Sequence, residues 1–255
     1  MSVDLAKVRE ISQESDKLFD TILNSVSHEL RTPIAIISAA VSNLQDPVTS
    51  ELPEIRGQIT GELESAAKRL NFLVENILDM SRIESGRMRL NFQVCDPDDL
   101  VGMALHTLEH ELKEHTPEVV VTGEVSPIKG DVSLLVQALV NVIHNAAVYA
   151  PAGTPIVITI YSVSPHKVAI AVADQGPGVP ETTLAKLFNK FYRVPGSNSG
   201  GTGLGLTITK AITEAHNGTV KAINQAGGGL CITLEFPAEE ANEKAEQILK
   251  KNGLI

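Results

Sequence analysis

The fold of the second half of the chain is indicated by one apolar stretch, DVSLLVQALVNVIHNAAVYA, at residues 131–150. Its apolar residues favour a helix that lies in a hydrophobic core. Two asparagines, Asn141 and Asn145, interrupt it four residues apart, so their side chains share one helix face. A buried amide needs a hydrogen-bonding partner, and an amide oxygen is a suitable ligand for magnesium. The pair indicates either a polar ligand at this face or asparagines that bond to a neighbouring loop.

Strand-like and helix-like segments alternate around this helix between residues 87 and 237. Helices are expected at 96–112, 181–191 and 204–218, and strands at 87–95, 118–125, 155–163, 167–174 and 219–237, the last as a hairpin around 227–229. This mixture favours a sheet with helices on one face. The fold class is therefore α+β.

The first 86 residues have a helical pattern almost without strand signals. One helix is expected at about 4–44 and a second at 53–84, joined by a turn at 45–54 that holds two prolines. The second helix carries a largely heptad seam at Ile55, Ile59, Leu63, Ala66, Leu70, Leu73, Ile77 and Met80. Two helices cannot bury such stripes alone. The hairpin is therefore expected to form a four-helix bundle in a homodimer; the alternative is packing against its own downstream domain.

Composition narrows the possible partners. The net charge of −10 argues against nucleic acid, and a hydrophobic content of 43% supports a real core. The cysteines, Cys95 and Cys231, are expected to be inert thiols in a reducing cytoplasm. We expect no membrane contact by this segment. The predicted domains are residues 1–86, a helical hairpin, and residues 87–237, an α/β domain, followed by a charged tail at 238–255.

Two glycine-rich stretches in the second half could hold a ligand. DQGPGVP, 174–180, follows a strand directly, so Asp174 could accept a hydrogen bond from an exocyclic amine, while Gly176 and Gly178 let the backbone approach closely. GGTGLGL, 200–206, opens a helix, whose dipole and free amides favour an anion such as phosphate. Each stretch alone also fits a plain glycine turn or a flexible loop.

SVSHELRTPI, residues 25–34, places a titratable pair and a proline inside a predicted helix. One nitrogen of the His28 imidazole can attack phosphorus if the other sheds its proton, and Glu29 is the neighbouring carboxylate that could take it. Pro33 should kink or loosen the helix after His28. The structural alternative is a satisfied interhelical His-Glu pair.

The order of these motifs resembles the transmitter region of sensor histidine kinases of two-component systems. The matching motifs are H-E-L-R-T-P (28–33), N-x-x-x-N-A (141–146), D-x-G-x-G (174–178), LFNKFYR (187–193) and G-x-G-L-G-L (201–206). The match spans about residues 18–237. The short linker between FYR and the second glycine box is similar to the potassium-responsive sensor kinase group.

The resemblance implies a fold and a set of roles. The fold would be a dimerising helical hairpin followed by an ATP-binding α/β sandwich of the gyrase type. His28 would be the phosphoacceptor, Glu29 its proton acceptor, and Thr32 the residue that orients a water for a reverse phosphatase activity. Phe188 and Phe191 match an aromatic box. The implied ATP-binding set is Asn141, Asn145, Tyr149, Asp174, Gly176, Gly178, Arg193, Gly201, Thr202, Gly203, Leu204 and Gly205.

The implied activity is ATP-dependent autophosphorylation of His28 and transfer to an aspartate of a response regulator. Magnesium would be held mainly by Asn145. Two positions depart from the family pattern: Val148 stands where a phosphate-binding lysine is frequent, and His144 stands where an acidic or polar residue is common. The competing functions are a gyrase-type ATP hydrolase without phosphohistidine and a non-catalytic scaffold. The segment is expected to be cytoplasmic, as part of a longer kinase that could be membrane-anchored.

Overall fold

The structure is a computed structural model that describes residues 26–27, 29–46, 52–85, 90–195 and 202–239. The chain divides into two compact units, with the main division between Ser81 and Arg82. The predicted tail lies largely outside the described residues, and the domain bounds at 86 and 237 stay predictions.

The first unit contains two helical segments. Residues 26–27 and 29–45 are helical, and α3 runs from Pro53 to Glu84, as predicted. Pro53 suits the first position of a helix because its missing N–H would have no partner there. The helical assignment continues from residue 29 through Pro33 to residue 45, so the proline does not end the helix.

The pattern of buried side chains along α3 follows the predicted heptad seam. Four side chains spaced seven residues apart are buried, namely Ile59, Ala66, Leu73 and Met80. Leu63, Leu70 and Ile77 form a second, half-buried row with the same spacing. A period of seven residues is the pattern of a helix that packs in a bundle.

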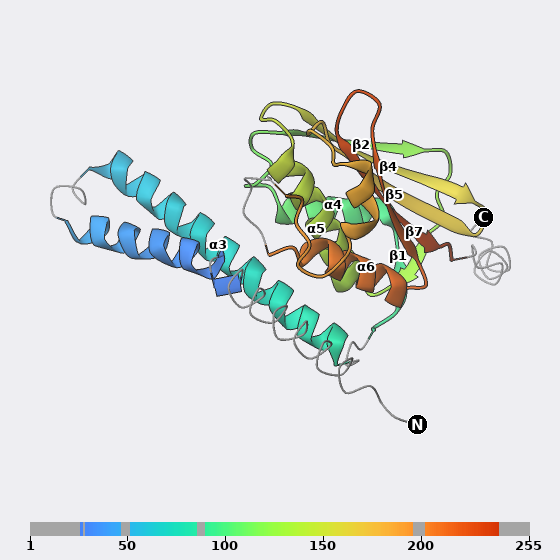
Figure 1. The fold of residues 1–255 in the computed structure, drawn as a ribbon, viewed down its shortest axis with the longest axis horizontal. Coiled ribbons are helices and arrows are strands. Elements are labelled where there is room, and N and C mark those ends of the chain that lie inside the picture. Colours follow the sequence, from blue (N-terminus) through green and yellow to red (C-terminus); the bar gives the residue numbers. More distant parts are fainter. Residues whose placement is uncertain (1–25, 28, 47–51, 86–89, 196–201, 240–255) are drawn as a thin grey trace, which may run out of the picture. The chain divides into compact units, whose positions relative to one another are not determined.

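The second unit is built on a five-stranded sheet (Figure 1). The strands are β2 (Thr116–Thr122), β4 (Pro155–Ser164), β5 (Lys167–Ala173), β6 (Thr219–Asn224) and β7 (Leu230–Pro237), in the order β2-β4-β5-β7-β6. β2 is parallel to β4, and the other neighbours are antiparallel. A separate two-stranded sheet pairs β1 (Gln93–Cys95) with β3 (Ile128–Gly130). The hairpin predicted around 227–229 is confirmed as β6–β7, and β4 and β5 pair as a second hairpin.

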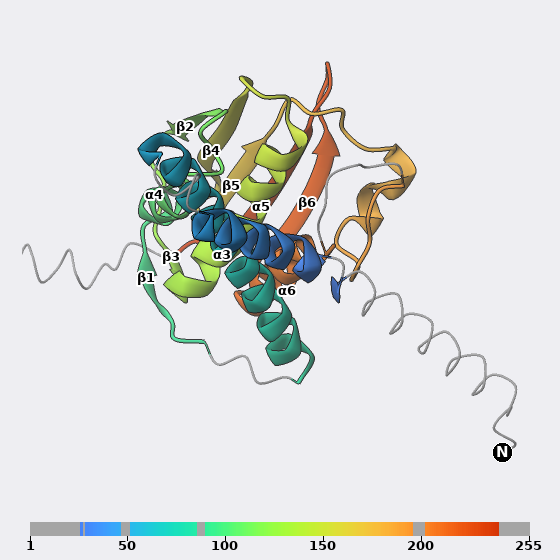
Figure 2. The same cartoon turned by 90° about the vertical axis from the view of Figure 1, so that its left-hand side faces the viewer.

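Helices cover one face of this sheet (Figures 1 and 2). They are α4 (Pro97–Thr107), α5 (Val132–Tyr149) and α6 (Gly205–Ala215). The core consists of alternate β4 side chains, Ile156, Ile158 and Ile160, together with α5 side chains such as Leu135, Leu139 and Ile143, all essentially fully buried. Asp96 and Asp131 cap α4 and α5 by accepting backbone N–H hydrogen bonds.

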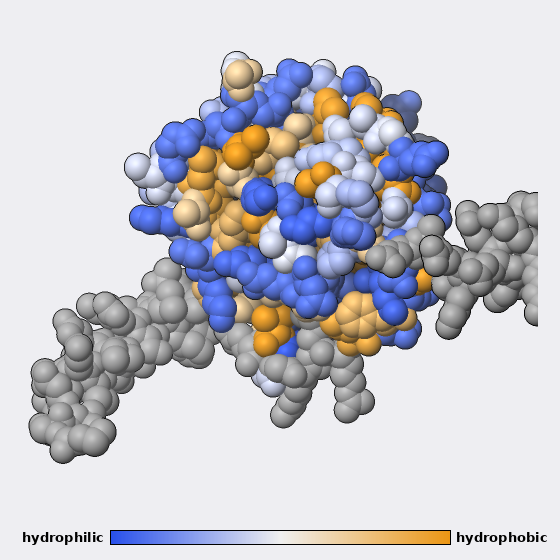
Figure 3. Space-filling model, turned by 90° about the vertical axis from the view of Figure 1, so that its right-hand side faces the viewer, coloured by the Kyte–Doolittle hydropathy of each residue, from blue (hydrophilic) through white to orange (hydrophobic). Residues whose placement is uncertain are grey.

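Among the described helices, α5 is long and apolar enough to cross a membrane by composition, with a mean hydropathy of 1.5. Many of its apolar side chains, such as Leu135, Leu139 and Ile143, are buried in the core, which is the ordinary setting of a central helix in a globular domain. On the side of the molecule drawn in Figure 3, hydrophobic side chains form separate groups among hydrophilic ones.

Several elements differ from their predictions. The helix expected at 96–112 is α4, which ends at Thr107, the strand expected at 118–125 is β2, and β3 was not predicted. Among the described residues of the strand expected at 87–95, only Gln93–Cys95 form a strand, β1, and the helix expected at 181–191 is a 3₁₀ helix, η1 (Glu181–Lys186). The helix expected at 204–218 is α6, which ends at Ala215. Asn217 follows in the left-handed conformation, with φ of 57°, and the Gly218 N–H donates to the carbonyl of Thr213 at 2.8 Å. This is a Schellman arrangement with asparagine in the glycine position.

Candidate functional site

Asp174 lies at the carboxyl end of β5, where its carboxylate is buried. Its Oδ1 accepts hydrogen bonds from the N–H of Gly176 at 2.8 Å and of Leu230 at 3.1 Å. Oδ2 accepts none from the residues that the structure describes. Burial raises the pKa of Asp174, and the two backbone donors oppose that rise. One carboxylate oxygen is thus fixed by the fold, and the other is left for a donor such as an amine.

The glycines that follow Asp174 allow close packing of backbone. A methyl group on Gly176 would lie 2.8 Å from the carbonyl oxygen of Tyr149, at the end of α5. Gly178 has φ of +68°, a conformation that side chains other than glycine rarely adopt. Both predicted glycines are therefore required by this turn.

Asn141 presents a buried amide without a partner. The residue is 1% exposed, and neither its Oδ1 nor its Nδ2 has a hydrogen bond among the described residues. Such an amide costs about 1–3 kcal/mol unless something else satisfies it. A methyl group on Gly205, the first residue of α6, would lie 3.5 Å from its Oδ1. The unpaired amide therefore faces the start of α6, and Asn145 follows one turn later on the same face of α5, half-buried.

The first turn of α6 supplies backbone donors beside Asn141. The first N–H groups of a helix have no partner within the helix, and the helix dipole attracts anions. Thr207, in this turn, has a buried hydroxyl without a partner among the described residues. Polar groups left unsatisfied from both helices fit a site for phosphate groups and their metal ion.

The loop ahead of α6 is packed against the aromatic segment. Gly203 has φ of +69°, and its carbonyl accepts from the N–H of Phe191 at 3.1 Å. A methyl group on Gly203 would lie 2.8 Å from the backbone of Phe191. Phe191 itself has φ of 59°, which is uncommon for a residue with a side chain and is more often found at functional sites.

The remaining residues predicted to bind ATP lie on α5 and in the segments before α6. Leu204 is buried just before α6, and Thr202 precedes Gly203 in the chain. Tyr149 and Val148 are exposed at the end of α5, His144 is half-buried on α5, and Arg193 is exposed. Gly201 lies outside the described residues.

In the first unit, His28 also lies outside the described residues, but its neighbour Glu29 is described. The Glu29 carboxylate is buried and forms an ion pair with Arg69 of α3, with Nη2 and Oε2 3.1 Å apart. Thr32 lies one turn further along the first helix and is exposed. Glu29 is thus paired across the two helices with an arginine, and the predicted roles of His28 and Glu29 stay predictions.

Sequence reasoning did not single out Arg69, or the residues of the β6–β7 hairpin that contact Asp174. In the sequence, Arg69 lies outside the apolar seam of α3, on a face that is expected to contact solvent. Gln225 donates from Nε2 to the carbonyl of Asp174 at 2.7 Å, but it stands beside three glycines and reads as part of a turn. A methyl group on Gly229 would collide with the same carbonyl. Only the fold brings these residues to the site.

Comparison with known families places both units. Residues 20–86 match the family model described as the His Kinase A (phospho-acceptor) domain. Residues 130–240 match the model described as the histidine kinase-, DNA gyrase B- and HSP90-like ATPase. A phosphoacceptor hairpin followed by this ATPase fold defines a transmitter region, and the chain belongs to the sensor histidine kinases.

Among individual proteins, the chain is similar to sensor protein KdpD. It is 33% identical over 251 residues to KdpD of Mycobacterium tuberculosis and 32% identical over 238 residues to KdpD of Escherichia coli. Each alignment covers 92% of this chain but only 29% and 26% of the relative. The chain thus spans under a third of the length of these relatives.

Solved structures agree with this placement. The histidine kinase AdeS of Acinetobacter baumannii has a TM-score of 0.59 and 29% identity, over 83% of this chain and 98% of that one. Full-length ShkA, solved in complex with AMPPNP, has a TM-score of 0.61 and 25% identity, over 85% of this chain and 45% of that one. Histidine kinase ThkA, solved in complex with response regulator protein TrrA, has a TM-score of 0.57 and 25% identity, over 94% and 69%.

Proposed function

We propose that this chain is the catalytic part of an ATP-dependent protein-histidine kinase. It phosphorylates His28 and passes the phosphoryl group to an aspartate of a response regulator. The observation that carries the proposal is the buried, unpaired amide of Asn141 beside the first turn of α6. A fold that served only as a scaffold would have no reason to bear that cost.

The ATP-binding roles are assigned from the positions of the residues and, for Asp174, from the carboxylate oxygen that has no hydrogen bond from the described residues. Asp174 accepts from the exocyclic amine of adenine through the oxygen that the protein leaves free. Gly176 and Gly178 shape the turn around the base, with Tyr149 at its edge. The backbone N–H groups at the start of α6 and the segment 201–205 bind the phosphates. Arg193 adds a positive charge, which matters because Val148 stands where a lysine is frequent.

Magnesium fits the amide side chains of α5. Asn145 is the main ligand and Asn141 assists, since an amide oxygen is a hard donor of the kind that this ion prefers. When bound, the ion neutralises charge on the phosphates during transfer. Asn141 keeps its buried position for this purpose without a competing hydrogen bond from the described residues.

The transfer itself requires His28 in its neutral form. One ring nitrogen forms a bond to the γ-phosphorus while the bond from that phosphorus to the bridging oxygen breaks, and ADP leaves with the electron pair. The other ring nitrogen gives its proton to Glu29. Arg69 holds the buried Glu29 carboxylate in the geometry that the structure shows.

The partners follow from the family and its relatives. The phosphoacceptor hairpin implies a homodimer. A response regulator is the acceptor, supported by the complex of ThkA with TrrA. Thr32, one turn from His28, orients a water in a reverse phosphatase reaction. The segment works in the cytoplasm as part of a longer kinase of the KdpD-like group, without direct contact with membrane or nucleic acid.

The test is to incubate the chain with magnesium and γ-labelled ATP beside a His28→Ala variant. We expect protein-bound label that survives alkali, is lost in acid, and is absent from the variant. Release of free phosphate without protein-bound label would identify a hydrolase. Bound ATP that stays intact would identify a scaffold.

A further inference from the structure

The last residue of β6, Asn224, forms hydrogen bonds with the loop that follows Asp174. Its Oδ1 accepts from the N–H of Val179 at 2.9 Å, and its Nδ2 donates to the carbonyl of the same residue at 2.7 Å. Nδ2 also donates to Oε1 of Glu181 at 2.9 Å, at the start of η1. One side chain thus satisfies both backbone groups of Val179 and holds the next element. Two hydrogen bonds to the same residue fix its orientation as well as its position.

Gly178 makes this contact possible. A methyl group on Gly178 would lie 2.8 Å from Oδ1 of Asn224, closer than real side-chain contacts allow. The absence of a side chain at Gly178 therefore serves the approach of Asn224, in addition to the left-handed turn described above.

The β6–β7 hairpin also forms hydrogen bonds with the other end of this loop, at Asp174. Gln225 donates to the carbonyl of Asp174, and the N–H of Leu230 donates to its Oδ1. The N–H of Asp174 in turn donates to the carbonyl of Leu230 at 3.0 Å. The segment from Asp174 to Val179 is therefore anchored at both ends by the β6–β7 hairpin, at one end through Leu230 and Gln225 and at the other through Asn224.

We propose that Asn224 is a positioning residue for recognition of the adenine amine, acting through the loop on Asp174. The inference rests on the proposed function, in which Asp174 reads that amine. When the Val179 end of the loop is released, Gly176 and its hydrogen bond to Oδ1 of Asp174 lose their fixed geometry. The carboxylate then discriminates less well between adenine and a purine that lacks the amine.

The experiment compares two nucleotides on the full chain. Dissociation constants for ATP and for purine riboside triphosphate, which lacks the exocyclic amine, are measured for the wild type, Asn224→Ala and Asp174→Asn. We expect the wild type to prefer ATP by about tenfold or more, as for one well-placed hydrogen bond to a charged group. In Asn224→Ala this preference should fall several-fold, toward the value in Asp174→Asn. Affinity for the analogue should change little.

The preference ratio separates positioning from general damage. Asn91→Ala is the matched control, since Asn91 is an exposed asparagine of the same unit and is not part of the site. Asn224→Asp is the second variant: it keeps the acceptor for the N–H of Val179 but loses both hydrogen bonds that Nδ2 donates. If Asn224→Ala fails to fold, the ratio in Asn224→Asp decides.

The outcomes are distinguishable from failure of the proposed function. A wild type that prefers ATP, with Asn224 variants that keep the same preference, overturns the inference and leaves the kinase assignment standing. A wild type that binds both nucleotides equally removes the role of Asp174, and the inference with it. Equal weakening of both nucleotides in the variants also overturns it, because that is the effect of a merely structural residue.

Discussion

At the scale of the residue, the ion pair between Glu29 and Arg69 involves the residue that follows His28 in the chain. A carboxylate as buried as Glu29 is costly to leave alone, so a partner is required, although such a pair adds little net stability. The Arg69 side chain is about half exposed, so water can replace Glu29 as the hydrogen-bonding partner of its guanidinium group. The pair is better explained as a way to orient the carboxylate than as a source of stability.

Replacing Arg69 should therefore slow phosphorylation more than it weakens nucleotide binding. We expect Arg69→Met to lower the maximal rate of His28 phosphorylation about tenfold, a fraction of what a general base contributes, with KM for ATP unchanged. Arg69→Lys should restore part of the rate. Arg56→Met makes the same substitution on an exposed arginine of α3 and should have no effect. Equal rates for the two methionine variants would show that Arg69 does not position Glu29.

The sequence predicted those residues whose chemical type is unusual for their surroundings. Asn141 is polar in an apolar helix, and Asp174 is a carboxylate between a strand and glycines, so both could be proposed from sequence. Both side chains are buried in the structure. Arg69 and Asn224 are ordinary residues for a helix surface and a hairpin end. Their partners lie 40 and 45 residues away in the chain, and only tertiary structure brings them together.

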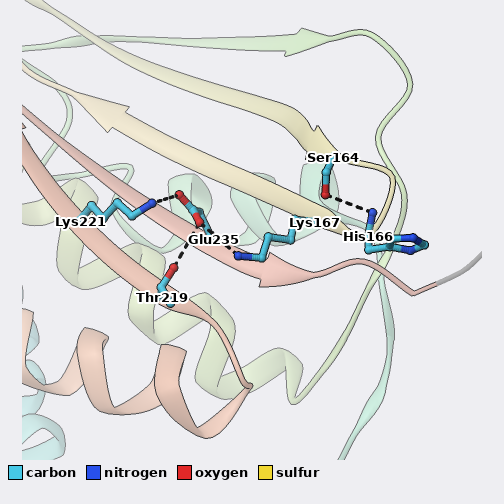
Figure 4. Close-up of polar contacts among 6 residues, drawn as sticks. All are labelled: Ser164, His166, Lys167, Thr219, Lys221 and Glu235. Atoms are coloured by element: carbon cyan, nitrogen blue, oxygen red, sulfur yellow. Dashed lines mark hydrogen bonds and ion pairs between the residues drawn. The ribbon is translucent and has the colours of Figure 1, made fainter.

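At the scale of the element, the open face of the sheet carries a charged cluster (Figure 4). Glu235 of β7 accepts from Nζ of Lys221 at 2.6 Å and from the hydroxyl of Thr219 at 3.2 Å, and Nζ of Lys167 lies 3.8 Å away. The hydrogen bond from Lys221 is the main reason that the pKa of Glu235 lies below its ordinary value. The cluster joins β5, β6 and β7 on the sheet face that none of the described helices covers.

The lowered pKa predicts how the stability of this sheet changes with pH. Because the folded state releases the proton of Glu235 more readily than the unfolded state, the contribution is present above the ordinary pKa of 4.5 and is lost as pH falls through the folded value. Glu235→Gln should cost about 0.5–1 kcal/mol near pH 7. The difference from wild type should shrink in acid.

Urea unfolding of both chains between pH 3 and pH 7 measures this difference. Glu118→Gln, an exposed glutamate on the edge strand β2, is the control and should be neutral. A difference that stays constant across this range would mean that packing, and not charge, accounts for the effect.

Elements with a strong period were predicted well, and short ones were not. The seven-residue period of α3 and the apolar length of α5 leave few alternatives. β1 is short because its partner β3 has only three residues, which no local pattern reveals. The segment 181–191 has too few residues to choose between α and 3₁₀ geometry without its contacts.

At the scale of the whole molecule, the hairpin leaves apolar side chains uncovered. Val74 and Leu78, one turn apart on α3, are 42% and 50% exposed. In a phosphoacceptor domain such side chains are expected to meet a second copy of the chain. A homodimer would be stabilised by mass action, so its melting temperature should rise with concentration.

A double variant, Val74→Glu with Leu78→Glu, tests this expectation. We expect sedimentation to show a dimer for the wild type and a monomer for the variant, and the concentration dependence of melting to disappear. Val163→Glu, which adds the same charge at an exposed valine of β4, should remain a dimer. A double variant that sediments as a dimer would place the interface elsewhere on the chain.

The pairing of β5 with β7 has a consequence for biosynthesis. Ala173 pairs with Cys231, so the two ends of the long segment that contains η1, α6 and β6 meet in the pairing of β5 with β7. On the ribosome, Asp174 emerges long before Leu230 and Gln225, which hold it in place. A nascent chain therefore cannot capture nucleotide as each loop appears. The site is completed in a single late event, when β7 has been synthesised and joins the sheet.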